Sequence, residues 1–298
     1  KQKTAYEIYQ CDWSSDVCSS DLPSLMPSTF SAIPLDDLVV QVRDGMLLAV
    51  PADYSGAPMV ATRALVRRGA KNLRLVTVPQ STLQADILIG VGCVAEIETA
   101  AVTLGEFGTA PCFTRAVLAK KIKVVDATCP AIHAGFQASE KDVPFLPLRG
   151  ILGSDLLKHR SDWKTVDNPL AEGGDPLLLI PAIRPDVALF HAPMADREGN
   201  IWIGRRRELA TIAHASKTTL VTVERLYDGS FFDDEKMAAG ALPAFYVNAV
   251  AVAERGAAPV GLFGEYEADI DHLRAYAKEA RTEAGFAAYL RSEEHTSE

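Results

Sequence analysis

Cysteine is scarce in this chain, and the few thiols present do not form a pattern. Five cysteines occur among 298 residues, and no two of them have the CxxC spacing. Zinc sites and the disulfide frameworks of small secreted domains need paired, regularly spaced cysteines. The sequence therefore predicts neither, and it favours a reducing compartment such as the cytoplasm.

Long hydrophobic runs and an excess of basic charge are also missing. No apolar run reaches the roughly 18 residues that suggest a membrane-spanning helix. The chain has 30 basic and 39 acidic side chains, so it lacks the positive footprint of a nucleic-acid-binding protein. We therefore expect neither a membrane nor a nucleic acid among its partners.

The two ends of the chain lack the composition of a folded domain. The opening KQKTAYEIYQCDWSSDVCSSDL has no helical or strand periodicity and no apolar signal-peptide core. Reverse translation of much of it, and of the closing RSEEHTSE, gives synthetic DNA adapters used in short-read sequencing. We interpret residues 1–22 and 291–298 as translated adapter, with a genuine disordered tail at each end as the alternative. Residues 23–290 would then form a single domain.

Within residues 23–290, short β-rich runs alternate with helical patterns. We predict strands at 47–50, 72–78, 85–92, 123–128, 177–183, 186–193, 201–204, 218–226 and 245–253. We predict helices at 57–70, 94–102, 113–120, 208–216 and 269–280. In the first of these segments, Pro58 is expected near the first turn and Gly69 past the helix end. Strands separated by helices indicate an α/β fold with an open, mostly parallel sheet covered by helices on both faces. Residues 149–175 break this pattern and are predicted to form a long functional loop or excursion.

Two glycine-containing segments are candidates for ligand contact. PADYSGAP (51–58) lies between a predicted strand and a predicted helix, where Ser55 and Gly56 could cradle an anion. Ser55 could equally be the N-cap of that helix. GVGCVA (90–95) imitates a dinucleotide fingerprint, but no acidic strand end follows about 20 residues later. Gly92 and Cys93 are therefore better read as a close backbone approach to another ligand or a neighbouring chain.

A few polar side chains are candidates for chemistry. Glu106 sits in the Gly-flanked segment LGEFGTAP and could be held close to a substrate, or it could be solvated surface. Cys129 has no obvious base beside it, which argues against a catalytic thiol. A lone histidine such as His191 is more often hydrogen-bonded structure than a metal ligand. The run Arg205, Arg206 and Arg207 begins a helix, where cations are disfavoured, so phosphate or carboxylate contacts compete with a solvated run.

Several longer segments, taken in order, point to one family. They are LVRRGAKNLRLV, ADILIGVGCVAEIETA, LGEFGTAPCFTRA, VPFLPLRGILGSDLL, DVALFHAPMADREGNIWIG, KTTLVTVERL and GAAPVGLFGEYEADIDHLRAY. Together they resemble the A-type subunit of the family I CoA-transferases, especially the glutaconate CoA-transferase type. The resemblance runs from about Leu35 to Tyr276.

The resemblance implies a function shared between two chains. Such A-type chains pair with a B-type chain, often as A2B2, and CoA passes between carboxylic acids through a glutamyl-CoA thioester. The nucleophilic glutamate belongs to the B-type chain, in a Ser-Glu-Asn-Gly-like setting that this sequence does not contain. The implied partners are the B-type subunit of a CoA-transferase, an acyl-CoA and a carboxylic acid. Coenzyme A would be a substrate, with no cofactor bound covalently at rest and no metal.

The resemblance also suggests which residues shape the acyl pocket. Main-chain groups near Ser55–Gly56, Gly92–Cys93 and Glu106–Gly108 would line it. The loop 149–155, with Arg149 and Gly153, would close over it. Glu106 is the one side chain in this set that is also a candidate for catalysis.

Departures from the family pattern leave two alternatives open. Many A-type chains have Gly-Gly after the first strand, where this chain has PADYSG (51–56). Loss of that pair is compatible with a non-catalytic assembly subunit. A related two-chain hydrolase opens a steroid ring with a glutamate on its A-type chain. The matching region, 126–130, has only Asp126 as an acid, which counts against that second alternative.

Overall fold

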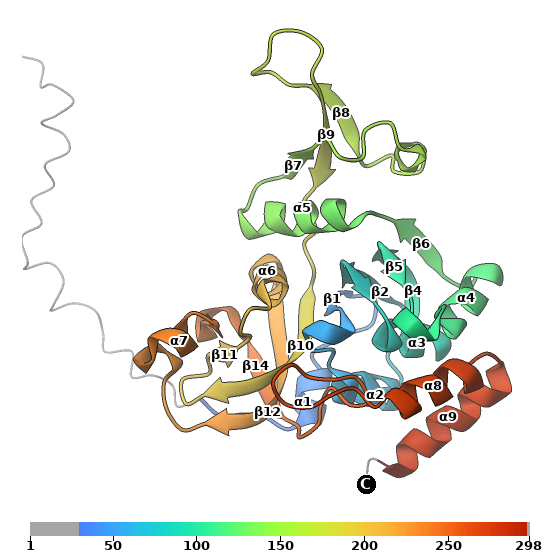
Figure 1. The fold of residues 1–298 in the computed structure, drawn as a ribbon, viewed down its shortest axis with the longest axis vertical. Coiled ribbons are helices and arrows are strands. Elements are labelled where there is room, and N and C mark those ends of the chain that lie inside the picture. Colours follow the sequence, from blue (N-terminus) through green and yellow to red (C-terminus); the bar gives the residue numbers. More distant parts are fainter. Residues whose placement is uncertain (1–29, 297–298) are drawn as a thin grey trace, which may run out of the picture. The chain divides into compact units, whose positions relative to one another are not determined.

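The computed structural model describes residues 30–296 of the chain (Figure 1). The predicted adapter segment 1–22 lies outside these residues. Residues 291–296 lie within them, in the last turns of α9 (Glu283–Thr296). The interpretation of both segments as translated adapter stays a prediction.

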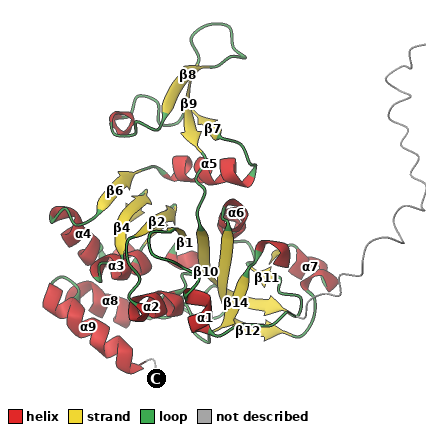
Figure 2. Cartoon of the chain, turned by 180° about the vertical axis from the view of Figure 1, so that it is seen from behind, coloured by secondary structure: helices red, strands yellow, loops and turns green. Residues whose placement is uncertain are grey.

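A nine-stranded sheet forms the centre of the described chain (Figure 2). Its main path runs β13-β11-β10-β1-β2-β4-β6, with β12 beside β10 and β14 beside β12. The strands are β1 (Leu47–Pro51), β2 (Leu73–Val78), β4 (Val94–Thr99), β6 (Lys123–Asp126), β10 (Val187–Asp196), β11 (Ile201–Trp202), β12 (Thr218–Tyr227), β13 (Ala241–Leu242) and β14 (Ala249–Val252). Among these described strands, only the pairs formed by β11 are antiparallel. The predicted open, mostly parallel α/β sheet is confirmed.

Helices lie on both faces of this sheet. They are α1 (Leu35–Val39), α2 (Met59–Arg68), α3 (Leu83–Gly90), α4 (Pro111–Leu118), α5 (Cys129–Glu140), α6 (Arg207–Ala215), α7 (Glu235–Ala238), α8 (Ile270–Glu279) and α9. Helices α5 and α6 pack together on one face, and α1 and α2 cover the other (Figure 1). Helix α2 follows Pro58 and ends at Gly69, whose left-handed φ of 72° suits the residue beyond a helix end, as predicted.

Two neighbouring predictions were wrong, because the predicted strand is a helix and the predicted helix begins with a strand. Residues 85–92 fall mostly in helix α3, and residues 94–99 form strand β4. Helix α3 is buried all round from Leu83 to Ile89, so it has no polar face whose period would reveal a helix. GVGCVA (90–95) is consequently a helix-to-strand turn, in which Gly92 adopts a φ of 79°. A dinucleotide fingerprint needs the opposite order, strand to helix.

Residues 145–181 form a separate three-stranded antiparallel sheet, so the break in the pattern predicted at 149–175 is an excursion from the main sheet. Its functional role stays a prediction. Strand β9 (Pro176–Pro181) lies between β7 (Phe145–Leu148) and β8 (Lys164–Asp167). This small sheet has its own core, in which Trp163 and Leu178 pack with Ala131 of α5. A further parallel pair joins β3 (Gln80–Ser81) to β5 (Ala101–Val102).

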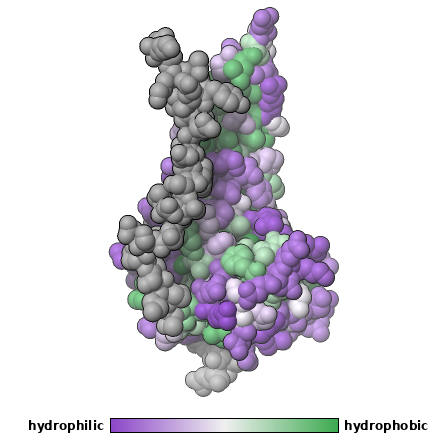
Figure 3. Space-filling model, turned by 90° about the vertical axis from the view of Figure 1, so that its left-hand side faces the viewer, coloured by the Kyte–Doolittle hydropathy of each residue, from purple (hydrophilic) through white to green (hydrophobic). Residues whose placement is uncertain are grey.

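Hydrophilic and hydrophobic side chains are interspersed on the face of the described residues that Figure 3 draws. On the face drawn in Figure 3, hydrophobic side chains gather in small patches between hydrophilic ones. None of the helices in residues 30–296 has the length and apolar character needed to cross a bilayer.

Candidate functional site

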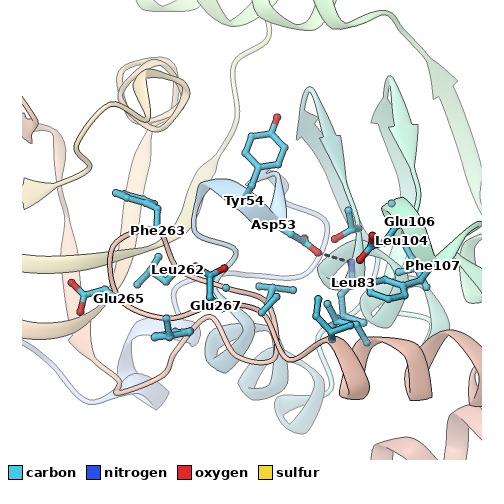
Figure 4. Close-up of a pocket in the computed structure, with 18 of the residues that line it drawn as sticks. Asp53, Tyr54, Leu83, Leu104, Glu106, Phe107, Leu262, Phe263, Glu265 and Glu267 are labelled. Carbon is cyan, nitrogen blue, oxygen red and sulfur yellow. Dashed lines mark hydrogen bonds between the residues drawn. The ribbon is translucent and has the colours of Figure 1, made fainter.

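A cavity of about 700 Å³ lies at the carboxyl ends of the parallel strands (Figure 4). Its walls come from segments that follow successive strands: 53–54 after β1, 82–83 after β2, 104–107 after β4 and 260–268 after β14. Arg206 adds a side chain from just before α6. Ligands of open α/β sheets bind at this edge, and the volume suits a small acyl group.

The cavity is mostly apolar, with charged groups at defined positions. Its apolar lining consists of Leu83, Leu104, Phe107, Val260, Leu262, Phe263, Ile270 and Leu273. In Figure 4, the Asp53 carboxyl points toward the side formed by Leu83 and Glu106, whereas Phe263 and Glu265 lie at the other side. An apolar pocket with a few placed polar groups is the usual form of a small-molecule site.

Asp53 is the most perturbed acid in the cavity. One of its oxygens, Oδ2, accepts a hydrogen bond from the backbone N–H of Leu83, 3.4 Å away. The other oxygen, Oδ1, is buried and has no partner among the described residues. Burial raises the pKa of Asp53 to about 7, although the backbone N–H groups of Leu83 and Thr82 oppose that rise. Near neutral pH this group therefore exists as both acid and carboxylate.

Arg206 is the cation of the cavity. Its guanidinium lies 4.9 Å from the ring centre of Phe263 and 5.8 Å from that of Tyr54. Its Nε is buried without a hydrogen-bond partner among residues 30–296, and no ion pair involves Arg206 there. A half-buried guanidinium held by aromatic faces can still bind a carboxylate.

The segment PADYSG contributes to the cavity in a different way from that expected. Ser55 is not the N-cap of α2, because that position is Pro58 and its side chain makes no capping bond. The Ser55 hydroxyl instead donates to the carboxylate of Glu208. The Gly56 carbonyl accepts a hydrogen bond of 2.8 Å from the N–H of His191, so this loop is fixed against β10. The fixed loop holds the Asp53 and Tyr54 side chains in the wall.

The other predicted site residues divide into two groups. Glu106 lines the cavity, and Gly108 closes the same turn, where its carbonyl accepts from the N–H of Leu104 at 2.9 Å. Gly92 and Cys93 follow the far end of α3, roughly 12 Å along the helix from its start at the cavity. They do not belong to the lining of this cavity.

Arg149 and Gly153 also lie outside the cavity lining. Both belong to the excursion, where the Arg149 guanidinium forms an ion pair of 2.7 Å with Asp175. The predicted roles of these two residues, and of Gly92 and Cys93, in substrate binding stay predictions.

A buried hydrogen-bond network supports the cavity wall from behind. The fully buried imidazole of His191 lies 2.7 Å from Glu224 through Nε2 and 2.7 Å from Thr222 through Nδ1. The hydroxyl of Tyr266, a lining residue, donates to the same Glu224 carboxylate at 2.7 Å. Burial alone would raise the pKa of Glu224, but the bonds from His191 and Tyr266 outweigh it and lower that pKa. His191 is thus a hydrogen-bonded structural residue, as expected.

Cys129 lies on the same helix as a histidine. Its thiol is exposed at the first residue of α5, and His133 follows four residues later on the same helix. Residues four apart lie on one face of a helix, but no hydrogen bond joins these two side chains among the described residues, so the interpretation of Cys129 stays a prediction. Burial lowers the pKa of His133, which keeps the imidazole neutral at physiological pH. Within residues 30–296, no group of three or more His, Cys, Asp or Glu side chains is placed to hold a metal.

The fold and the cavity together define an α/β protein with a small-molecule site at a sheet edge. A family model described as "Coenzyme A transferase" matches residues 34–253. The chain belongs to the coenzyme A transferase family, and the predicted resemblance is confirmed.

Similar proteins include subunits of a CoA-transferase and of a hydrolase, and a longer protein of uncharacterized function. The A subunit of the 3-oxoadipate CoA-transferase of Pseudomonas knackmussii is 30% identical over 84% of this chain and 88% of the relative. The Cholesterol ring-cleaving hydrolase IpdA subunit of Rhodococcus jostii is 32% identical over 56% of this chain and 58% of its own. An uncharacterized protein of Archaeoglobus fulgidus is 30% identical over 84% of this chain. The match spans only 56% of that longer protein.

Two solved structures share the architecture. Glutaconate coenzyme A-transferase from Acidaminococcus fermentans superposes with a TM-score of 0.80, covering 88% of both chains at 24% identity. A variant of the decarboxylase AibA/AibB superposes with a TM-score of 0.75 at 28% identity, covering 88% of this chain and 98% of the other. The architecture is thus shared with a protein described as a transferase and with one described as a decarboxylase.

Proposed function

We propose that this chain is the A-type subunit of an enzyme that moves coenzyme A between an acyl-CoA and a carboxylic acid. A B-type partner chain would supply the catalytic glutamate. The observation that carries the proposal is a ligand-sized, mostly apolar cavity at the carboxyl ends of the strands in a chain of this family. Similarity to a protein described as the A subunit of a CoA-transferase supports it.

The chemistry assigns separate tasks to the two chains. A partner carboxylate attacks the thioester carbonyl, expels CoA thiolate and leaves an anhydride. The thiolate then attacks the glutamyl carbonyl, which releases the first carboxylic acid and leaves a glutamyl-CoA thioester. An acceptor carboxylate reverses these two steps and departs as the new acyl-CoA. No atoms are gained from water, so the energy of the thioester is conserved.

This chain would hold the acyl group and keep water away from the intermediates. Its apolar lining suits a hydrocarbon chain, and Arg206 is placed to bind a carboxylate. Glu106 lines the same cavity and is the candidate within this chain for contact with the reacting groups. The Glu106→Gln substitution tests that role, since it removes the charge and keeps the shape.

The experiment is acceptor dependence in the complex of both chains. The complex would be incubated with an acyl-CoA, and thioester exchange would be followed with and without a free carboxylic acid. We expect acyl-CoA of the second acid to form only when that acid is present, with little free CoA. Release of free CoA at a rate that ignores the acceptor would contradict the proposal.

The hydrolase alternative has one specific observation in its favour. The relative described as a cholesterol ring-cleaving hydrolase subunit is 32% identical over 174 residues. In this chain Asp126 is exposed at the end of β6, and the half-buried acid nearby is Glu98 at the end of β4. Burial raises the pKa of Glu98, but Arg160 pairs with it at 2.8 Å. Acceptor-independent release of CoA would favour this alternative.

The third alternative is a non-catalytic assembly subunit. Although PADYSG replaces a glycine pair, this segment lines the cavity with Asp53 and Tyr54 rather than filling it. We therefore expect the complex to bind acyl-CoA. Failure of the purified complex to bind any acyl-CoA in equilibrium dialysis would favour an assembly role.

A further inference from the structure

Unpartnered polar atoms collect at the beginning of helix α3. They are Asp53 Oδ1, Ser81 Oγ, Thr82 Oγ1 and both amide atoms of Gln84, all buried and without partners among the described residues. Ser81 and Gln84 are fully buried. Buried polar atoms nearly always have partners in a folded protein, so such a cluster calls for a ligand or ordered water.

Asp53 and Thr82 connect this cluster to the cavity. Both line it, and one Asp53 oxygen already accepts the N–H of Leu83 at 3.4 Å. The second Asp53 oxygen is the atom available to a molecule inside the cavity. Because α3 begins here, its N–H groups also favour a negatively charged or electron-rich group.

The charges around the cavity determine the form in which Asp53 can bind an anion. Besides Asp53, the lining has three acids, Glu106, Glu265 and Glu267, and one cation, Arg206. Glu265 is neutralised by a two-bond pair with Arg225, at 2.6 and 3.0 Å. Tyr54 and Tyr266 also face the cavity, and burial raises the pKa of each, so both are neutral. An ionised Asp53 would therefore add repulsion for a carboxylate, whereas an acid would not.

We propose that Asp53 is a specificity-determining residue that binds the carboxylate of the acid substrate as a protonated acid, donating one hydrogen bond to it. Binding of the carboxylate is then accompanied by uptake of one proton. The proposal rests on the proposed function, because it assigns the carboxylic acid to this cavity. Thr82, beside Asp53 in the wall, offers a hydroxyl to the second carboxylate oxygen.

The pKa of Asp53 determines how the Kd for a carboxylate should change with pH. Burial raises the pKa of Asp53 to about 7, so the acid form is abundant below neutrality. A ligand that needs the acid form binds most tightly there, and its Kd rises about tenfold per pH unit above the pKa. A Kd that is independent of pH would mean that binding is not coupled to protonation of Asp53.

The test is calorimetric titration of the two-chain complex between about pH 5.5 and 8.5. Acetate, butyrate, glutaconate and 3-oxoadipate serve as probes, each in two buffers with different heats of ionisation. The difference between buffers reports the number of protons bound. We expect uptake to approach one proton above neutral pH, together with the tenfold weakening per unit. The proposal would be overturned if binding took up no proton, or if none of the four carboxylates bound.

Two variants separate binding from folding. Asp53→Asn keeps an acceptor for the Leu83 N–H and a permanent donor, so its Kd should be flat with pH and close to the low-pH value of the unsubstituted complex. Glu254→Gln removes an exposed charge outside the cavity lining and should retain the proton uptake. If Asp53→Asn does not fold, the unsubstituted complex alone decides the outcome. Proton-linked binding without CoA transfer would contradict only the proposed function, and transfer without proton uptake would contradict only the role of Asp53.

Discussion

Single residues hold the floor of the cavity in place, and Gly56 is the most constrained of them. A Cβ at Gly56 would collide with the carbonyl oxygen of His191, and the φ of Gly56 is +87°. Neither β10 nor the loop can move away from the other without breaking the hydrogen bond between the His191 N–H and the Gly56 carbonyl. The glycine is therefore required by contact as well as by conformation.

We expect Gly56→Ala to destabilise the fold by about 3 kcal/mol or more, since strain at positive φ adds to the collision. Gly45→Ala is the matched control. Gly45 has a φ of +80°, and a Cβ there would meet no atom within 4 Å. That control should cost only about 1–2 kcal/mol. Urea unfolding of both variants measures the difference, and equal losses would refute the collision.

Arg206 supports a prediction about substrate affinity. Replacing it with alanine removes the cation of the cavity, so the KM for the acid substrate should rise about tenfold or more in the two-chain assay. The neighbouring Arg205 is exposed and does not line the cavity, so Arg205→Ala should leave KM unchanged. A KM that responds equally to both substitutions would show that only general surface charge matters.

The lowered pKa of Glu224 implies that the free energy of unfolding depends on pH in the acid range. Its pKa is lowered in the folded state, so its contribution is fully present above the unfolded value near 4.5 and is lost as the pH falls through the lower folded value. Glu224→Gln should cost about 1–3 kcal/mol at neutral pH and weaken the acid dependence below about pH 4.5. The exposed neighbour Glu254, changed to glutamine, should leave both unchanged. Unfolding free energies at several pH values measure the effect.

The sequence predicted the roles of single residues correctly where those roles depend on neighbouring residues in the chain. Gly69 was predicted to follow a helix and does so with a left-handed φ. Asp53 was not singled out, although it lies two residues before the predicted Ser55. Its importance comes from burial against Leu83, thirty residues further along the chain. That contact leaves no local signal in the sequence.

At the scale of elements, burial explains which predictions failed. Amphipathic helices such as α2 and α6 show their period in the sequence, because one side faces solvent. Helix α3 packs against α2 and α4 and is buried from Leu83 to Ile89, so its sequence resembles that of a buried strand. A short, mostly apolar segment such as this one does not distinguish a buried helix from a buried strand.

Arg160 links the excursion to the ends of two strands of the main sheet. Arg160 is only 6% exposed, and it bonds Glu98 at 2.8 Å and the carbonyl of Asp126 at 3.0 Å. Its guanidinium also lies 4.2 Å from the ring centre of Trp163. The small sheet is thereby connected to both β4 and β6.

Replacing Arg160 with methionine should loosen this attachment. The substitution leaves Glu98 half-buried without its cation, which we expect to cost about 3–5 kcal/mol. Hydrogen exchange should increase in residues 145–181 before it increases in β1 and β2. The control is Lys158→Ala, because Lys158 pairs with Asp155 in an exposed position and should contribute almost nothing. Uniform protection in the Arg160 variant would contradict the anchoring role.

At the scale of the whole molecule, the fold and family were accessible from the sequence, whereas the composition of the site was only partly so. Alternating strands and helices, together with seven ordered segments, predicted the sheet and the CoA-transferase family. The cavity assembles side chains from positions as distant as Asp53, Arg206 and Leu262. Such a combination depends on strand order, which the pattern of elements alone does not specify.

The central claim is that this chain supplies half of an active site and that the attacking carboxylate comes from a partner. The most direct measurement is mass spectrometry of the two-chain complex after mixing with acyl-CoA, with both chains digested and searched for a covalent CoA adduct. The account predicts a glutamyl-CoA thioester on a peptide of the partner and none on this chain, with no adduct when this chain is mixed alone. A CoA adduct on Glu106, or on any other side chain of this polypeptide in the absence of a partner, would contradict it.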